Sequence, residues 1–245
     1  VRRGGNLGSG IVTKPIDFYY WPTPNGWKAS IALEELGIDY DVVYLHFDKN
    51  EQKTSAFLRL NPNGRIPVIV DHDHTDFVLA ESGAILLYLA ERSGQLWPTD
   101  PLLRHQAMQW LMFQMSAVGP MLGQAMFFQR IAAPKGIVVD YAIERYVNES
   151  RRLLCILNDR LADRDYLCGT YSMADIATFT WARAYRWGNI EVDDLMSLKG
   201  WFARIEARDA VQRGIRVPTG KPPPSYDSEA DLSEATRRNA EQYDA

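Results

Sequence analysis

Cysteine is scarce in this chain. Its 245 residues include two cysteines, Cys155 and Cys168, and neither belongs to a C-x-x-C pair. This count argues against a disulfide framework and against a zinc site, so we predict that the protein uses no metal. Free cysteines usually behave as small buried hydrophobic residues, and we expect both to be buried.

The sequence also lacks a strong excess of charge and a long apolar run. Its 27 basic and 31 acidic residues give a net charge of -4, which leaves no basic footprint for nucleic acid. The most membrane-like window, 107–128, contains three glutamines and a Gly-Pro break, whereas a spanning helix needs about 20 largely apolar residues. No apolar run follows the basic residues near the start, so no secretory signal is visible. We expect no nucleic-acid partner, no membrane partner and a cytoplasmic location.

Short strands and helices alternate in the first third of the chain. The periodicity and the turn residues predict strands over 16–20, 41–46, 66–71 and 77–80 and helices over 26–36, 54–60 and 82–93. The first strand, helix and strand form a parallel βαβ unit, and the last two strands form an antiparallel hairpin. The expected order is therefore βαβ-α-ββα.

After this α/β unit the periodicity is helical as far as about residue 209. The fold class we predict is α/β plus all-α, with an α/β domain followed by an all-helical domain. The expected divisions are a flexible leader over 1–15, the α/β domain over 16–93, a Gly- and Pro-marked linker over 94–103, the all-α domain over 104–217 and a polar tail over 218–245.

The corner Thr23-Pro24-Asn25-Gly26 separates the first strand from the first helix. Thr and Asn cap helices well and Pro suits the first turn, so these residue types fit a plain helix start. The free N–H groups and partial positive charge of such a start would also stabilise a thiolate, with Thr23 and Asn25 as added donors. The corner contains no cysteine, so the thiol would have to belong to a ligand.

Two further corners are candidate binding elements. Pro67 fits an edge-strand proline, or a cis peptide bond that lets the Ile66 backbone pair with an extended peptide. Ser82 fits a helix cap. Together with Glu81 it also fits a cup in which the hydroxyl and free N–H groups hold a carboxylate while Glu81 pairs with an amine.

Three other motifs have structural interpretations. His72-Asp73-His74 is typical of a solvated turn, and a metal site is the less favoured alternative. The methionine-rich run over 108–126 favours core or interface filling, with an adaptable substrate wall as the alternative. Ser172 and Asp175 match a capping box that begins a helix over 172–187.

Together these motifs resemble the glutathione transferase superfamily. The matching stretches are NPNGRIPVIVD, ESGAILLYLAE and SMADIA, and the resemblance covers about residues 16–217. TPNG at the first helix, GPMLGQ at 119–124 and YAIERY at 141–146 are similar to the nu class. That class groups bacterial disulfide-reducing transferases with fungal relatives of the nitrogen-catabolite prion protein.

The resemblance implies a thioredoxin-like glutathione-binding domain over 16–93 and a homodimer. It implies an enzyme, a disulfide-bond oxidoreductase with one or two molecules of reduced or oxidised glutathione per subunit, in which Thr23 and Asn25 stabilise the glutathione thiolate. The implied ligand contacts are the Ile66 backbone beside cis Pro67 for the cysteinyl unit, Glu81 and Ser82 for the γ-glutamyl end, Gln52 and Arg65 for the glycine carboxylate, and Arg145 near the ligand.

Two other functions stay open. The protein could conjugate glutathione to small electrophiles, with the apolar wall near 108–128 as the acceptor site. It could also be a non-catalytic, glutathione-binding regulatory protein. Many transferase classes use a tyrosine near the first strand, so Tyr19 and Tyr20 are further candidates for a direct role.

Overall fold

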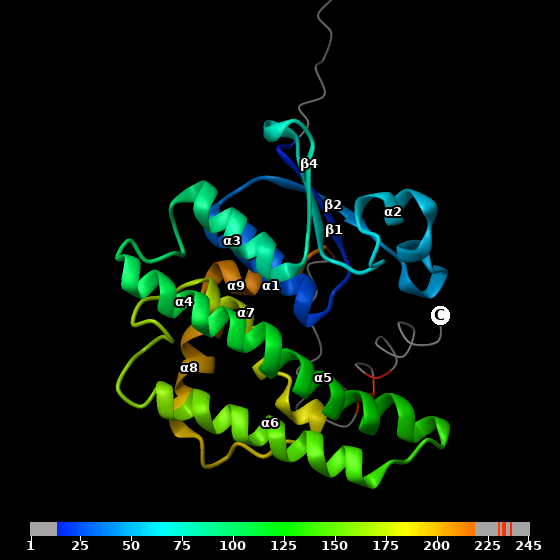
Figure 1. Cartoon of the computed structure of the whole chain (residues 1–245), viewed down its shortest axis with the longest axis vertical. Coiled ribbons are helices and arrows are strands. Elements are labelled where there is room, and N and C mark those ends of the chain that lie inside the picture. The colour runs from blue at the N-terminus through cyan, green and yellow to red at the C-terminus, as the bar shows by residue number, and fades with distance from the viewer. Residues whose placement is uncertain (1–13, 219–229, 231, 234–235, 237–245) are drawn as a thin grey trace, which may run out of the picture.

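The computed structural model describes residues 14–218, 230, 232–233 and 236. Most of the predicted leader and most of the predicted tail lie outside the described residues. In the described part, a small sheet with its helices lies above a larger group of helices in the view of Figure 1.

A four-stranded sheet forms the centre of the N-terminal part. Its strands are β1 (Ile16–Tyr20), β2 (Tyr40–Tyr44), β3 (Val68–Asp71) and β4 (Phe77–Ala80), in the spatial order β2-β1-β3-β4. β1 runs parallel to β2 and antiparallel to β3, and β3 runs antiparallel to β4. A parallel pair needs a crossover connection, which α1 (Pro24–Leu36) supplies. The predicted βαβ unit and hairpin are confirmed.

The remaining helices of this part are α2 (Ser55–Leu60) and α3 (Ser82–Ser93). The strand predicted from Ile66 begins instead at Val68, since Pro67 has no N–H to donate to the ladder. The Ile66–Pro67 peptide bond is cis, as predicted.

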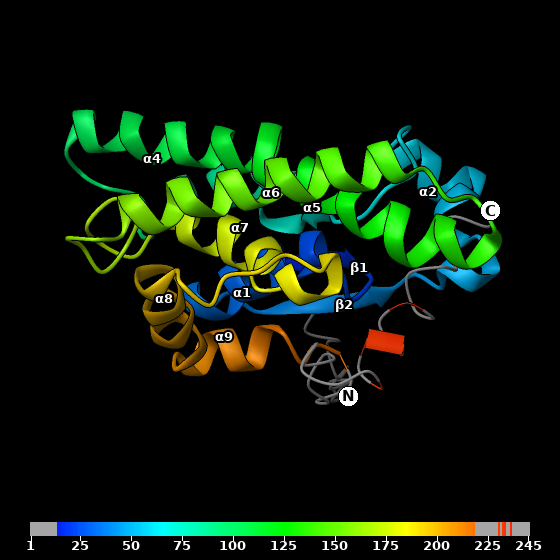
Figure 2. The same ribbon diagram turned by 90° about the horizontal axis from the view of Figure 1, so that it is seen from below.

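The rest of the described chain is helical. Its α-helices are α4 (Pro101–Phe113), α5 (Gly119–Met126), α6 (Asp140–Arg160), α7 (Met173–Ala182), α8 (Met196–Glu206) and α9 (Asp209–Gly214), and π-helical turns at Gln114–Val118 and Phe127–Ala132 flank α5. Figure 2 shows α5 and α6 side by side. The helix predicted over 172–187 was too long. α7 ends at Ala182, and a separate 3-10 turn over Tyr185–Gly188 stops at Asn189, whose backbone is left-handed.

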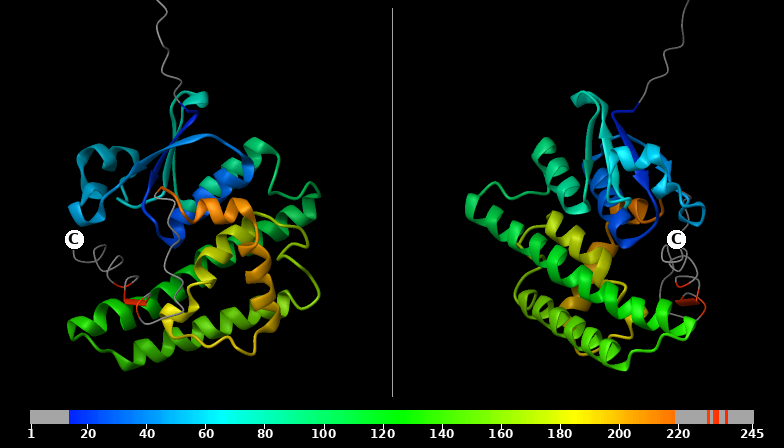
Figure 3. Two further views of the ribbon diagram at one scale, coloured as in Figure 1. Left: turned by 180° about the vertical axis from the view of Figure 1, so that it is seen from behind. Right: turned by 45° about the vertical axis from the view of Figure 1, so that its right-hand side comes forward.

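One hydrophobic core runs through both parts of the molecule. α1 packs against α3 within the α/β part and against α7 and α9 of the helical part (Figure 3). The contact with α9 is close. A Cβ at Gly214 would lie 2.7 Å from the Cα of Ile31, and the Ser30 hydroxyl donates to the Gly214 carbonyl at 2.8 Å. The helical part therefore holds α1 directly.

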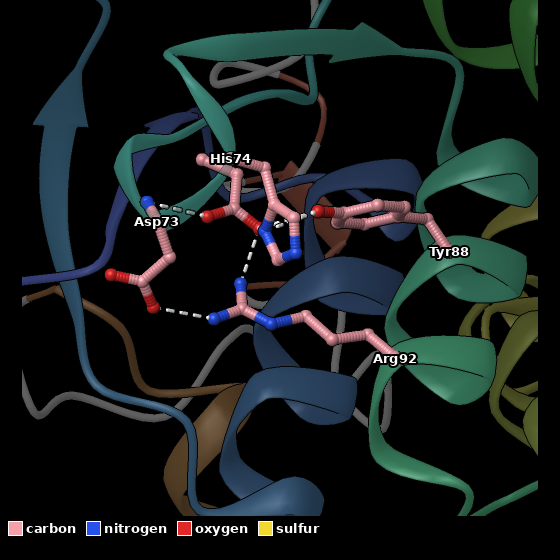
Figure 4. A network of polar contacts seen from close by, with 5 residues as sticks. Asp73, His74, Tyr88 and Arg92 are labelled. Atoms are coloured by element: carbon pink, nitrogen blue, oxygen red, sulfur yellow. Dashed lines mark hydrogen bonds and ion pairs between the residues drawn. The ribbon is translucent and has the colours of Figure 1, made fainter.

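A network of polar contacts lies at the C-terminal end of β3, around Asp71 (Figure 4). The buried carboxylate of Asp71 accepts a hydrogen bond from Tyr88 at 2.5 Å and pairs with Arg92, which also contacts Asp73 at 2.7 Å. Burial opposes ionisation of Asp71, but these hydrogen bonds and the nearby guanidinium hold its pKa below the usual value. His74 pairs with Asp71 as well, so the predicted turn is tied to this network.

Candidate functional site

A cavity of about 420 Å³ lies where the α/β part meets the helical part. The α/β part supplies most of its polar lining and the helical part most of its apolar lining. The residues from the α/β part are Thr23, Pro24, Asn25, Phe47, Asn61, Asn63, Arg65, Ile66, Pro67, Glu81 and Ser82, and those from the helical part are Met115, Gly123, Gln124, Met126, Phe127, Ile131, Trp181 and Trp187. Seven of the nine site residues predicted from the sequence are thus brought together.

Thr23 caps α1 and faces the cavity at the same time. Its hydroxyl oxygen accepts a hydrogen bond from the Gly26 backbone N–H at 3.3 Å, and the residue is 8% exposed. A hydroxyl has two acceptor positions and one donor, so capping leaves the Thr23 hydrogen free to donate to a ligand. Gly26 is required by close approach, since a Cβ there would lie 2.2 Å from the Trp21 carbonyl oxygen. The two interpretations of this corner are therefore compatible.

Asn25 lies two residues further along, in the first turn of α1. Its side-chain oxygen accepts a hydrogen bond from the Trp181 indole at 2.9 Å, and both residues line the cavity. Trp181 belongs to α7, so a helix of the second part contacts the first turn of α1.

The start of α3 presents a second set of donors to the cavity. Ser82 is the first helical residue and is 4% exposed, whereas Glu81 is exposed and has a left-handed φ of 71°. No side chain caps this helix start, so the first backbone N–H groups of α3 remain available to an anion. A positive φ at a non-glycine residue is strained and is often found at binding sites.

Lys28 lies buried on α1 beneath these two helix starts. Its ammonium nitrogen lies 2.7 Å from the Gln114 side-chain oxygen and 3.4 Å from the Ser82 hydroxyl. Burial lowers the pKa of Lys28 to about 7, and the negative charge of Glu81 offsets part of this lowering. A protonated amine only donates, so Ser82 accepts from Lys28 and keeps its own hydrogen for the cavity.

The turn before Pro67 forms the rim of the cavity. The Asn61 amide donates to the Arg65 carbonyl at 2.7 Å, and its oxygen accepts from the Asn63 backbone at 3.1 Å. These bonds hold the turn in shape, while the Arg65 side chain is exposed at the rim. An exposed guanidinium in this place can pair with a carboxylate.

Gln52 and Arg145 do not line the cavity. Gln52 is 4% exposed, and its backbone carbonyl lies under the turn at Gly64. Arg145 is exposed on α6 and lines a separate groove with Met121 and Tyr141. The ligand contacts implied for Gln52 and Arg145 remain predictions.

The other groups considered from the sequence lie away from the cavity lining. Tyr20 is fully buried, which raises its pKa well above the usual value, and half-buried Tyr19 packs against Phe57. Cys168 is buried, and burial raises the pKa of its thiol to about 11. Cys155 is half-buried on α6, so the expectation that both cysteines are buried was wrong for this one, which lies at the edge of the helix packing.

Sequence reasoning missed Lys28, Trp181 and Gln114. A signal existed for Lys28, since it is the one charged residue in the run GWKASIAL over 26–33. A lysine within such a helix is unusual and points to a polar partner. Trp181 and Gln114 gave no local signal, because their partners lie far away in the sequence.

The α/β part combines a thioredoxin-like sheet, a cis proline at the cavity and two helix starts that line the cavity, and no cysteine is among the lining residues. The profile described as "Glutathione S-transferase, N-terminal domain" matches residues 14–91. The chain is 42% identical over 205 residues to the disulfide-bond oxidoreductase YfcG of Escherichia coli, covering 82% of this chain and 94% of that protein. It belongs to the glutathione S-transferase family, whose members include disulfide-bond oxidoreductases.

Two further similarities agree with this assignment. A glutathione transferase from Burkholderia graminis, crystallised with two glutathione molecules per subunit, is 43% identical with a TM-score of 0.81, and the match covers 85% of this chain and 90% of that one. Protein URE2 of Candida glabrata is 37% identical over 153 residues, which are 60% of this chain and 42% of that protein. The predicted likeness to both bacterial and fungal relatives is confirmed.

Within the described residues, no helix combines the length and the apolar character needed to cross a membrane. No group of three or more His, Cys, Asp or Glu side chains in that part of the chain is arranged to hold a metal ion.

Proposed function

We propose that this chain reduces small disulfides with glutathione bound in the cavity, and that Thr23 and Asn25 stabilise the glutathione thiolate. The observation that carries the proposal is the open start of α1, where the Thr23 hydroxyl and the Asn25 amide reach a cavity that no cysteine lines. A free thiol has a pKa of about 8.5 and reacts as the thiolate, so donors at this position increase the reactive fraction.

The other polar groups would hold the rest of the tripeptide. The Ile66 backbone beside Pro67 pairs with the cysteinyl unit, and Ser82 with the free N–H groups of α3 binds the γ-glutamyl carboxylate. Glu81 takes the amine of the same end. Arg65 on the rim, with Gln52 beneath the turn, receives the glycine carboxylate, and Arg145 approaches the ligand from α6. These ligand contacts rest on the positions of the groups and on the family.

The reaction needs two glutathione molecules and no thiol from the protein. The bound thiolate attacks one sulfur of the disulfide, forms a mixed disulfide and releases the other sulfur as a thiolate, which takes up a proton. A second glutathione then attacks the glutathione sulfur of the mixed disulfide. Oxidised glutathione forms and the second product thiol leaves, so one disulfide is reduced for each pair of glutathiones oxidised.

Conjugation of glutathione to electrophiles is the second candidate. The apolar wall of Met115, Met126, Phe127 and Ile131 favours it, because an aromatic or alkyl acceptor would pack there. Both activities would use the same thiolate.

We further propose that the protein is a homodimer in the cytoplasm. Large apolar side chains are exposed on β4 and α4, namely Phe77, Val78, Leu102, Leu103 and Met112, and a dimer interface would cover such residues. A reaction that consumes reduced glutathione suits a reducing compartment. Sedimentation velocity should give twice the 27.9 kDa subunit mass.

Paired kinetics test the proposed activity. Purified protein is assayed with hydroxyethyl disulfide and with chlorodinitrobenzene, each over a range of glutathione concentrations. A higher kcat/KM with the disulfide supports the oxidoreductase, and the reverse supports conjugation. Glutathione binding by calorimetry without turnover of either substrate would point to the regulatory protein. A Cys155→Ser, Cys168→Ser double variant should keep its disulfide reductase activity, and loss of activity in the folded variant would refute a reaction without protein thiols.

A further inference from the structure

The contact between Trp181 and Asn25 fixes which end of the Asn25 amide can reach a ligand. An indole N–H can only donate, so the atom that it contacts at 2.9 Å must be the amide oxygen. The amide nitrogen then lies on the other side of the group, and it makes no hydrogen bond to another described residue. Asn25 lines the cavity, so its donor end is left for whatever the cavity binds.

Two glycines of α5 hold the indole in place. A Cβ at Gly123 would lie 3.3 Å from the six-membered ring of Trp181, and a Cβ at Gly119 would lie 3.5 Å from its nitrogen. These glycines are four residues apart and therefore share one face of the helix. The ring thus packs between this glycine face and the first turn of α1.

We propose that Trp181 is a positioning residue for the thiolate reaction, because it holds the Asn25 amide with the nitrogen directed toward the glutathione sulfur. The inference rests on the proposed function, in which Asn25 is a donor to that sulfur. Without the indole, the amide can rotate and present its oxygen to the thiolate. The partial negative charge of that oxygen would destabilise the thiolate. The helical part of the molecule would then set the chemistry of the first helix turn of the α/β part.

The test combines Trp181→Phe with Asn25→Ala in a double-mutant cycle. Trp181→Phe keeps an aromatic side chain beside the glycine face, but it removes the N–H donor and reduces the size of the ring system. We expect it to lower kcat for disulfide reduction by roughly 3- to 30-fold and to raise the pKa of enzyme-bound glutathione, measured from thiolate absorbance near 240 nm. In the Asn25→Ala background the same substitution should have no further effect on either quantity.

A second variant tests the position of the ring without removing the donor. Gly123→Ala puts a methyl group where the ring must shift by a few tenths of an ångström. We expect a smaller rise of the thiol pKa than in Trp181→Phe, and again none in the Asn25→Ala background. Trp110→Phe on α4, outside the cavity lining, makes the same chemical change and should leave both quantities unaltered.

The outcomes separate this inference from the proposed function. If Asn25→Ala lowers kcat and raises the thiol pKa but Trp181→Phe and Gly123→Ala do not, the positioning role is overturned and the function stands. Equal losses from Trp181→Phe in both backgrounds would show a general structural role and would also overturn it. If Asn25→Ala itself changes neither quantity, the donor role of Asn25 fails, and the inference fails with it.

Discussion

The starts of α1 and α7 use similar chemistry with opposite results. At each, a capping side chain accepts a backbone N–H, and an indole donates to a polar residue of the first turn: Trp181 to Asn25 in α1, and Trp201 to Asp175 in α7. The start of α7 is fully buried and closed. Asp175 accepts from the Leu167 and Ser172 backbones, the Ser172 hydroxyl and the Trp201 indole, at 2.9 to 3.0 Å.

The start of α1 leaves donors unused instead. Thr23 and Asn25 both line the cavity, and the Thr23 hydroxyl hydrogen and the Asn25 amide nitrogen make no hydrogen bond to another described residue. The uncapped start of α3 adds its backbone N–H groups. A helix start contributes to stability when its donors and acceptors are paired within the protein, and it can bind a ligand when some of them are left over. The predicted capping box is confirmed at α7, where Asp175 accepts from the backbone N–H of Ser172.

The closed start should show the largest effect on stability. Asp175→Ala leaves four donors without their acceptor in the core, so we expect the free energy of unfolding to fall by about 3 kcal/mol. Urea denaturation measures this, and turnover per folded molecule should be unchanged. The matched change at an exposed aspartate, Asp163→Ala, should not alter stability measurably. A small effect of Asp175→Ala would mean that α7 does not depend on its cap.

The open start of α1 should show its largest effect in turnover. Loss of one donor to a thiolate is worth about 1.5 to 3 kcal/mol, so Thr23→Ala and Asn25→Ala should each lower kcat by roughly one to two decades with a smaller change in glutathione affinity. Steady-state kinetics and calorimetric binding on the same preparations measure both.

Thr54 provides the control for capping alone. Its hydroxyl caps α2 by accepting from the Phe57 backbone at 3.4 Å, and it does not line the cavity. Thr54→Ala should lower stability by about 1 kcal/mol and leave kcat unchanged. If Thr23→Ala behaves in the same way, Thr23 is only a cap.

A substitution at the start of α3 should affect glutathione binding more than the rate of the reaction. Ser82→Ala removes a donor to the non-reacting end of glutathione, so the Michaelis constant for glutathione should rise by about tenfold while kcat changes little. Ser55→Ala, at the first position of α2, is the matched control and should change neither. A fall in kcat at an unaltered Michaelis constant would contradict the assignment of Ser82 to binding.

The smallest effect should be the change of stability with pH that comes from Lys28, the buried amine beneath the starts of α1 and α3. Lys28 has a pKa of about 7 in the folded protein and 10.5 as its reference value, so between these values the unfolded chain binds more protons. The unfavourable burial of the ammonium is therefore present below pH 7 and is relieved as the pH rises through that value.

Because stability rises with pH above 7 in the wild type, its pH dependence should differ measurably from that of Lys28→Met. From pH 7 to pH 8, wild type should gain at most about 1.4 kcal/mol of stability relative to the variant, as measured by urea denaturation at each pH. Lys53→Met, at an exposed lysine, should show no such change relative to wild type. A constant difference between wild type and Lys28→Met would mean that Lys28 does not titrate in this range.

The sequence by itself determined the local features of this protein. The order of strands and helices along the chain, the capping residues Thr23, Ser82 and Ser172, and the turn at Ile66-Pro67 were all predicted, because strand alternation, capping and proline geometry act between residues a few positions apart. The corner residues also carried the family resemblance, and with it the expectation of glutathione chemistry without a protein thiol.

Tertiary structure decided which of these local features work together. The indole that orients Asn25 comes from 156 residues away, and the partners of Lys28 are 54 and 86 residues away in the chain. Tertiary structure also placed Arg145 in a groove apart from the cavity that Thr23 lines. Such pairings depend on how α1 packs against the helical part, and hydrophobic periodicity specifies which face of a helix is buried but not which side chain it meets there.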